Sequence, residues 1–189
     1  MGSKVPLVLI VVSLVVGCGT QPEYQQPVQQ NQQVLYMDDT YESLNKSLEA
    51  EVKSDQVQIK QYKNRLQVTM ANEILFSEGG WEVGPHGIEM LNKVSPSLRN
   101  LNGKRVVVQG FTDSLPVAAT LRARFPTNWE LSADRATNVV RHLQTLGVDP
   151  SMLAAEAFGE YEPIAPNDTE EGRRKNRRIN IMIEDSDLQ

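Results

Sequence analysis

The chain has one cysteine, two histidines and no excess of basic residues. A single cysteine cannot form an intramolecular disulfide. His86 and His142 lie far apart and belong to no group with metal-ligand spacing, so no metal site is expected. The formal net charge is −5, which argues against general nucleic-acid binding, because that requires a basic surface. Gly79 and Gly80 lack the lysine and the strand that a phosphate-binding loop needs. We therefore expect no cofactor.

The apolar run near the N-terminus is too short for a permanent membrane span. It covers residues 5–16 and follows Lys4, whereas a spanning helix needs roughly 20 apolar residues. The run is typical of a signal peptide, here residues 1–17. Cys18 follows Gly17 at its end and resembles a bacterial lipoprotein box, which implies cleavage before Cys18 and lipidation of that cysteine. The alternative is an ordinary signal peptide with an incidental cysteine. Gly19, in place of an aspartate, favours the outer membrane by the same resemblance.

Two polar segments separate this leader from the rest of the chain. Residues 18–35 include seven glutamines and too few apolar residues to bury a core, so we expect a mobile tether. Residues 36–65 contain no glycine or proline and are rich in helix-forming residues, which predicts one long helix. Asp38, Asp39 and Thr40 are candidates for its N-terminal cap.

The apolar residues of the segment 36–65 recur at spacings of three and four, from Tyr41 to Leu66. This spacing favours a coiled-coil seam with one phase slip between Leu48 and Val52. A seam would make the segment a homodimer contact or a binding surface for a protein partner. The alternatives are a single helix that packs on the following domain, or a spacer arm of about 45 Å at 1.5 Å per residue.

Residues 66–185 carry the periodic patterns of a folded domain, followed by a tail at 186–189. Alternating or continuous apolar residues predict strands at 66–70, 104–111, 152–159 and 178–184. Helical periodicity predicts helices at 85–101 and 131–146. The order is strand, helix, strand, helix, strand, strand. The sequence therefore predicts an α+β fold, a β-α-β-α-β-β sandwich in which helices pack on one face of a mixed sheet.

The stretch from Gly110 to Arg135 brings an acid and a base toward one place. Asp113 stands where the apolar strand 104–111 gives way to polar residues, and Arg135 lies in the first turns of the next helix. A carboxylate accepts hydrogen bonds from an ammonium, and a guanidinium binds a carboxylate bidentately. The pair predicts a site for a ligand that carries both groups. The alternatives are a turn-capping aspartate and a solvated surface arginine.

Four blocks, in this order, resemble one family. They read GFTD at 110–113, NWELSADRA at 128–136, FGEYEPIAPND at 158–168 and GRRKNRRINIMI at 172–183. The chain resembles the OmpA/MotB-type peptidoglycan-binding domain over residues 66–185. The form of the second block and the long loop Leu115–Thr127 resemble flagellar stator B subunits. The role of this loop is not predicted by the sequence.

The resemblance implies roles for particular residues. Asp113 would contact the diaminopimelate, or its equivalent, of the wall stem peptide, and Arg135 would hold the ligand carboxylate. Thr112 would bind through its backbone, and Leu131 would pack under the site. Asn128 and Ser132 either contact ligand or cap the helix. Of the two arginines in the last block, the register favours Arg178 over Arg177 at the cleft, and Asn176 is expected to order the loop.

The resemblance and the absence of a catalytic group together imply a binding protein. We expect a non-enzymatic outer-membrane lipoprotein that binds peptidoglycan and faces the periplasm, with no catalytic residues. One alternative is a wall-anchoring component of a flagellar or secretion assembly, and another is a wall-sensing regulator whose helix binds a partner.

Overall fold

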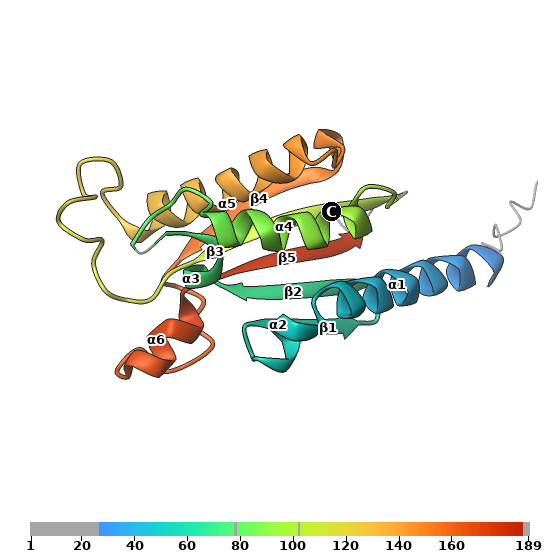
Figure 1. Ribbon diagram of the computed structural model, residues 1–189, viewed down its shortest axis with the longest axis horizontal. Coiled ribbons are helices and arrows are strands. Elements are labelled where there is room, and N and C mark those ends of the chain that lie inside the picture. The colour runs from blue at the N-terminus through green and yellow to red at the C-terminus, as the bar shows by residue number, and fades with distance from the viewer. Residues whose placement is uncertain (1–26, 78, 102, 187–189) are drawn as a thin grey trace, which may run out of the picture.

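A mixed sheet of five strands, in the order β1-β2-β5-β3-β4, forms the frame of the domain (Figure 1). The computed structural model describes residues 27–77, 79–101 and 103–186. The pair β3–β4 is parallel and the other three pairs are antiparallel. The strands are β1 Val57–Tyr62, β2 Arg65–Ala71, β3 Lys104–Phe111, β4 Leu153–Gly159 and β5 Arg178–Asp185.

The long helices cover one face of this sheet. Figure 1 shows α4 and α5 across that face, with α1 beside α4 near the β1 side. A short helix, α6, lies beyond one end of the sheet, close to where β3 ends. The helices are α1 Pro27–Ser47, α2 Glu49–Lys53, α3 Asn72–Leu75, α4 Pro85–Leu98, α5 Asn128–Thr145 and α6 Glu170–Asn176, and a 3-10 turn, Pro150–Met152, precedes β4.

The core lies between the sheet and these helices. Ile179, Ile181 and Ile183 of β5 alternate toward it, and all three are fully buried. Leu91 of α4 and Leu143 of α5 are fully buried against them. Each such side chain contributes roughly 1.5–3 kcal/mol relative to exposure. The opposite face of the sheet carries mainly polar residues, among them Gln58, Thr69, Gln109 and Asn180.

The predicted order of strands and helices is confirmed from β2 to β5. The helix α5 connects β3 to its parallel neighbour β4, as a crossover between parallel strands requires. Among the described residues, no helix is both long and apolar enough to cross a bilayer.

The N-terminal helix exists, but its predicted boundaries are wrong. It begins at Pro27, so residues 27–35 of the predicted tether are helical, and the predicted cap at residues 38–40 lies inside the helix. Proline is favoured in the first helical turn, and glutamine is a good helix former. The rest of the predicted tether, the signal peptide and Cys18 lie outside the described residues.

The prediction of one helix over residues 36–65 is also wrong. The helix α1 ends at Ser47, and residues 57–62 form β1, which pairs antiparallel with β2 from Val57↔Met70 to Tyr62↔Arg65. Val57 and Ile59 alternate with polar residues, which suits an edge strand. The intervening glutamines and lysine suit a helix equally well, and only the pairing with β2 decides between the two.

The apolar residues of the predicted seam pack into the core of the domain, and α1 lies beside α4. Met37, Leu44 and Leu48 are at most 4% exposed and belong to the main core. Glu51 of α2 forms an ion pair of 2.7 Å with Lys93 of α4. The coiled-coil and spacer-arm interpretations are therefore wrong for residues 37–53, and the alternative of a helix packed on the domain is the one observed.

Candidate functional site

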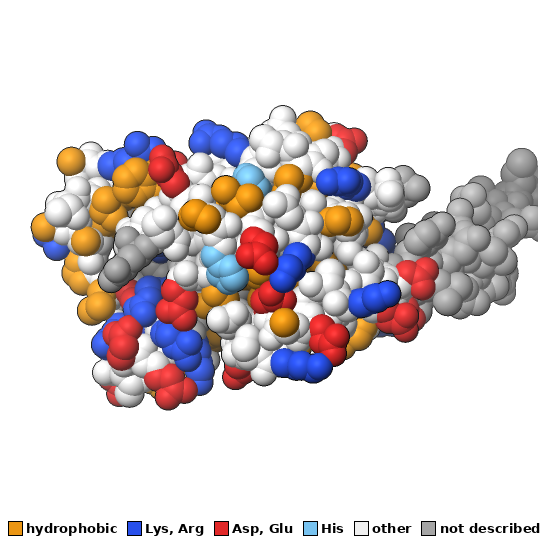
Figure 2. Space-filling view, in the orientation of Figure 1, with side chains coloured by type: hydrophobic (Ala, Val, Ile, Leu, Met, Phe, Trp, Pro, Cys, Tyr) orange, Lys and Arg blue, Asp and Glu red, His pale blue; other side chains and the backbone are white. Residues whose placement is uncertain are grey.

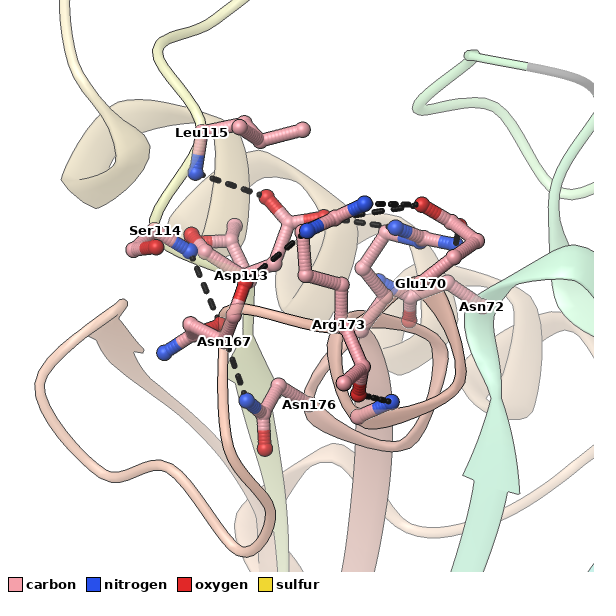
Figure 3. Close-up of polar contacts among 12 residues, drawn as sticks. Asn72, Asp113, Ser114, Leu115, Asn167, Glu170, Arg173 and Asn176 are labelled. Atoms are coloured by element: carbon pink, nitrogen blue, oxygen red, sulfur yellow. Dashed lines mark hydrogen bonds and ion pairs between the residues drawn. The ribbon is translucent and has the colours of Figure 1, made fainter.

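The candidate site lies where β3 ends and α5 begins (Figure 3). Gly110 lets the helix come close to the strand, because a Cβ atom there would stand 2.2 Å from the carbonyl oxygen of Ser132. The Thr112 N–H donates to the Gly159 carbonyl across 2.8 Å, which ties the end of β3 to the end of β4. The strand ends therefore hold Asp113 in a fixed place.

Asp113 is nearly buried, at 7% exposure. Its Oδ1 atom accepts a hydrogen bond of 3.0 Å from the Leu115 N–H. Its Oδ2 atom accepts one of 2.6 Å from Arg177 Nη1. The first bond is the turn-capping contact, and the second is a charge-assisted bond of the stronger kind. Asp113 thus combines a structural role with a charged partner.

Arg177 belongs to a cluster of alternating charges next to α6. Its Nη2 atom donates to Glu170 Oε1 over 2.7 Å. Arg173 donates to the other oxygen of Glu170 and to the Asn167 carbonyl. Hydrogen bonds from Arg177 and Arg173 lower the pKa of Glu170. Figure 2 shows acidic and basic side chains gathered over this part of the surface, which matches the alternation of charge.

Two asparagines hold the loop before α6 against Asp113. Asn176 is fully buried, and its Oδ1 atom accepts from the backbone N–H groups of Ile164 and Ala165. Its Nδ2 atom donates to Asn167 Oδ1, which also accepts from the Ser114 N–H. The prediction that Asn176 orders this loop is confirmed.

Arg135 is 7% exposed and reaches the site from α5. Its Nε and Nη2 atoms donate to the Gly80 carbonyl at 3.0 and 2.7 Å, and its guanidinium lies 5.4 Å from the centre of the Phe76 ring. Burial lowers the pKa of Arg135 to about 10, an effect that Asp113 opposes. Arg135 is therefore cationic at neutral pH and interacts electrostatically with Asp113. The ion pairs of the described chain join Asp113 to Arg177 and include none with Arg135.

The remaining predicted residues surround this pair. Thr112 is buried, with its hydroxyl donating to the Asp113 carbonyl. Asn128 Nδ2 donates to the carbonyls of Asp113 and Leu115 and to Glu160 Oε2. Ser132 Oγ accepts from the Gly159 N–H. Leu131 is 7% exposed and packs in a cluster of its own beside the site.

The helix cap is neither Asn128 nor Ser132, so that interpretation of these two residues is wrong. Thr127 caps α5: its hydroxyl accepts from the Trp129 N–H, and Glu130 accepts from the Thr127 N–H. This is a capping box, in which side chains satisfy otherwise unpaired donors of the first turn. Asn128 does not cap the helix, because its side-chain amide donates to the carbonyls of Asp113 and Leu115.

Arg178 does not lie at Asp113, so the preference for Arg178 over Arg177 is wrong. Its guanidinium stands 3.7 Å from the centre of the Phe111 ring and donates to the carbonyls of Glu162 and Asn176. It lines a hollow on the polar face of the sheet with Thr69 and Asn180. Successive residues of a strand point to opposite faces, and Arg178 is the first residue of β5.

Three further residues lie among these contacts and were not predicted from the sequence: Asn72, Glu170 and Arg173. Asn72 is 5% exposed, its backbone N–H donates to the Arg177 carbonyl, and its Nδ2 atom donates to the Phe111 carbonyl. Its Oδ1 atom has no hydrogen-bond partner among the described residues. A buried acceptor without a partner is costly, and Asn72 lies directly after β2 at the same end of the sheet as Arg177. The sequence signal that could have pointed to Asn72 is its place as a polar residue directly after β2.

The long loop between β3 and α5 is anchored by a second, small hydrophobic cluster. Val117 and Phe125 are at most 5% exposed and pack with Leu131. Trp81 lies against Phe125 edge to face, with 5.3 Å between ring centres, and Arg124 lies 4.8 Å from the Trp81 ring. The loop therefore has a packed base of its own beside the site.

Comparison with known proteins identifies the family. Residues 75–177 match the OmpA family. Over 129 residues the chain is 30% identical to Motility protein B of Bacillus subtilis, which covers 68% of this chain and 48% of that protein. Over 116 residues it is 33% identical to the Escherichia coli protein named Probable lipoprotein YiaD, covering 61% of this chain and 50% of that one. The chain thus spans about half the length of these curated relatives.

Two solved structures resemble the whole domain. A putative MotB-like protein from Desulfovibrio vulgaris superposes with a TM-score of 0.73 at 26% identity, covering 84% of this chain and 96% of that one. The cell wall anchor of the type VI secretion system from Pseudomonas aeruginosa superposes with a TM-score of 0.68 at 31% identity, covering 76% and 97%. The match over more than half of the sequence, together with the shared fold, shows that this chain belongs to the OmpA family.

Proposed function

We propose that this protein binds peptidoglycan non-covalently, through a stem-peptide residue such as diaminopimelate that carries both an ammonium and a carboxylate. Asp113 receives the ammonium. Arg135 receives the carboxylate. The domain holds the wall and performs no reaction on it. Its membership of the OmpA family and its likeness to a solved cell wall anchor support this proposal.

The main support for the proposal is that Arg135 is buried and has no ion-pair partner among the residues that the structure describes. A buried charge is costly unless a counter-charge or good hydrogen bonds compensate it. The Gly80 carbonyl takes two of the guanidinium donors, Nε and Nη2, and a carbonyl neutralises no charge. The Nη1 group takes no part in these two bonds. A ligand carboxylate would supply a counter-charge in direct contact with the guanidinium, which Asp113 provides only at longer range.

Asp113 offers the complementary end of the site. It is within electrostatic range of Arg135, since its charge opposes the lowering of the Arg135 pKa. Opposite charges in one region favour a ligand that carries both, and they disfavour a simple anion or cation, because one of the two groups would repel it. This selectivity matters in a wall that is rich in carboxylates.

The proposed location is the periplasmic side of the outer membrane. Lipidation of Cys18 would anchor the chain to the membrane. The 33% identity of the chain to a protein named as a probable lipoprotein supports this anchor. Several acyl chains on one cysteine would hold the protein firmly, because each buried methylene contributes about 0.8 kcal/mol. Replacing Cys18 with serine should release the protein into the soluble periplasmic fraction and abolish incorporation of labelled palmitate; retention in the membrane fraction would contradict this anchor.

Co-sedimentation with purified sacculi tests the site. Arg135→Ala and Asp113→Ala should each remove most of the bound protein, whereas the matched control Arg174→Ala should bind as the wild type does. Arg174 is a suitable control because it lies in α6 near the cluster but pairs with Glu73 on the surface. Circular dichroism should confirm that each variant is folded. Unchanged co-sedimentation of both site variants would contradict the proposal.

The second candidate function is the wall-anchoring part of a flagellar or secretion assembly. The similarity to a motility protein and to a secretion-system anchor favours it. It uses the same peptidoglycan site, so the two candidates differ only in partners. A crosslinking experiment in intact cells distinguishes them: reproducible products with proteins of one machine, lost when that machine is deleted, would favour the assembly, and their absence would favour a plain envelope tether.

A further inference from the structure

The face of the sheet that is turned away from α4 and α5 has a hollow of its own. Its volume is about 540 Å³, which is within the range for ligand pockets, roughly 300–1,000 Å³. A row of four polar side chains crosses the hollow, one from each of four neighbouring strands: Gln58, Thr69, Asn180 and Gln109. Neighbouring strands lie about 4.8 Å apart, so the row is roughly 14 Å long. An extended peptide of about four residues has the same length.

The side chains of this row have hydrogen-bonding groups to spare. Gln67 donates to the Thr69 hydroxyl and this hydroxyl donates to Asn180 Oδ1, each over 2.9 Å. Gln109 Nε2 donates to Glu156 Oε2, also over 2.9 Å. The amide nitrogen of Asn180 and the amide oxygen of Gln109 take no part in these bonds. One is a donor and the other is an acceptor, as the C=O and N–H groups of a peptide backbone require.

Arg178 lines the same hollow and is only 4% exposed. Its guanidinium lies over the Phe111 ring and donates to the carbonyls of Glu162 and Asn176. Among the described residues Arg178 forms no ion pair, whereas its neighbour Arg177 forms two. Burial lowers the pKa of Arg178 to about 10, and the charge of Glu162 opposes this effect at longer range. Arg178 is therefore a cation at neutral pH, and a buried cation is costly unless a counter-charge compensates it.

The charge of the hollow favours a carboxylate ligand. Lys60 is a second cation of the lining and is exposed, and Glu162 is the one carboxylate of the lining. The hollow is thus positive on balance, although the whole chain has a formal net charge of −5. A guanidinium binds a carboxylate through two parallel N–H groups. One or two carboxylates would compensate Arg178 and Lys60, whereas a polymer with a charge on every unit would meet Glu162.

We propose that this hollow binds an extended acidic segment of a partner protein, with one carboxylate on Arg178 and the backbone along the polar row. Arg177 and Arg178 are successive residues and point to opposite sides. The partner segment and a wall ligand at Asp113 therefore occupy separate sides of the chain. The apolar side chains Met37 and Leu44 of α1 pack into the core, so the sheet face, and not a seam on α1, is the surface for this partner.

The test is a fluorescence-anisotropy titration of the full chain with two short labelled peptides. One alternates glutamate with threonine, and its twin has glutamine in place of glutamate. The wild type should bind the acidic peptide roughly tenfold tighter, as a charge-assisted contact predicts. Arg178→Gln should remove this preference, and Lys60→Gln, at an exposed position where folding is not at risk, should reduce it severalfold. Arg65→Gln, at an exposed arginine of β2 outside the hollow, should keep it.

Three outcomes would overturn this inference. The first is equal affinity of the wild type for the two peptides. The second is a preference that Arg65→Gln reduces as much as Lys60→Gln does, because the attraction would then be general. The third is binding of the free wall tetrapeptide that depends on Arg178, because the hollow would then serve the wall. Arg135→Ala should bind the acidic peptide as the wild type does, so failure of this inference and failure of the peptidoglycan site are distinguishable.

Discussion

Arg177 Nη1 lies 2.6 Å from Asp113 Oδ2, so the acid of the candidate site is paired within the chain. The same arginine binds Glu170 of α6 through its other terminal nitrogen. In the proposed mode of binding, the ammonium of the ligand would share the Asp113 carboxylate with Arg177. The pair links α6, which belongs to the end of the chain, to the end of β3. The site is thus assembled from segments far apart in sequence.

Replacing Arg177 with alanine should weaken sacculus binding severalfold, because Asp113 and α6 lose a shared charge-assisted contact. A hydrogen bond to a charged group contributes about 1.5–3 kcal/mol where it is protected from water, and less here, since the Arg177 side chain is 31% exposed. Co-sedimentation measures the effect. The matched variant Arg178→Ala should keep its binding and lose stability, because that side chain packs on Phe111. Loss of binding in Arg178→Ala with normal binding in Arg177→Ala would instead favour Arg178 at the cleft, as the sequence predicted.

The ion pair between Glu51 and Lys93 should make stability depend on pH in the acid range. The hydrogen bond from Lys93 lowers the pKa of Glu51 below its ordinary value of 4.5. A carboxyl group whose pKa is lowered in the folded state contributes its full stability at a pH above the ordinary pKa. This contribution is lost as the pH falls through the lowered pKa of the folded state. Urea unfolding should show the wild type more stable than Glu51→Gln at pH 7, with the gap closing below pH 4.5. A gap independent of pH would contradict this.

Gly110→Ala should destabilise the domain strongly, because the added Cβ would meet the Ser132 carbonyl oxygen at 2.2 Å. Overpacking of this kind typically costs about 1–3 kcal/mol or more. Gly103→Ala is the matched control: its Cβ meets nothing within 4 Å, but the residue has a φ of 68°. Its cost should be about 1 kcal/mol. Chemical denaturation compares the two, and an equal or smaller loss in Gly110→Ala would show that β3 and α5 are not in close contact.

Thr127→Ala should remove the capping box of α5 and cost about 1 kcal/mol of unfolding free energy. The start of α5 carries Asn128 and Trp129, so binding should also weaken, by less than in the Asp113 and Arg135 variants. Thr120→Ala, in the exposed part of the same loop, should change neither quantity. A thermal melt of the three proteins gives the answer, and a Thr127→Ala protein as stable as the wild type would argue against the cap.

The sequence predicts the sheet-and-helix order because the hydrophobic periods are local. Ile179, Ile181 and Ile183 alternate, and Pro85 and Gly147 mark a helix start and a helix end, so each of these segments shows its type without its neighbours. Residues 57–62 are different. Gln58, Lys60 and Gln61 suit either helix or strand, and the decision comes from pairing with β2, which the local pattern does not contain.

The positions of the candidate site residues could be predicted where a residue type is matched to the end of a strand or helix, and not where the register of a strand decides. Asp113 at a strand end and Arg135 near a helix start converge because β3 and α5 are adjacent in sequence and space. Choosing between Arg177 and Arg178 needs the phase of β5 relative to the turn before it, and a shift of one residue reverses the faces. The stacking of the Trp129 and Tyr161 rings was also not predicted from the sequence, because it depends on the conformation of the turn after β4.

Competition by free diaminopimelate tests whether the protein holds peptidoglycan through the diaminopimelate of the stem peptide. The full chain is bound to purified sacculi, and diaminopimelate is added in increasing amount. Glutamate and lysine are the controls, because each has one α-amino-acid end and a third charged group but lacks the second amino-acid end. Diaminopimelate should release the protein, the two controls should release far less, and Arg135→Ala should bind too little protein for release to be followed. Protein that stays on the sacculi at saturating diaminopimelate would contradict it.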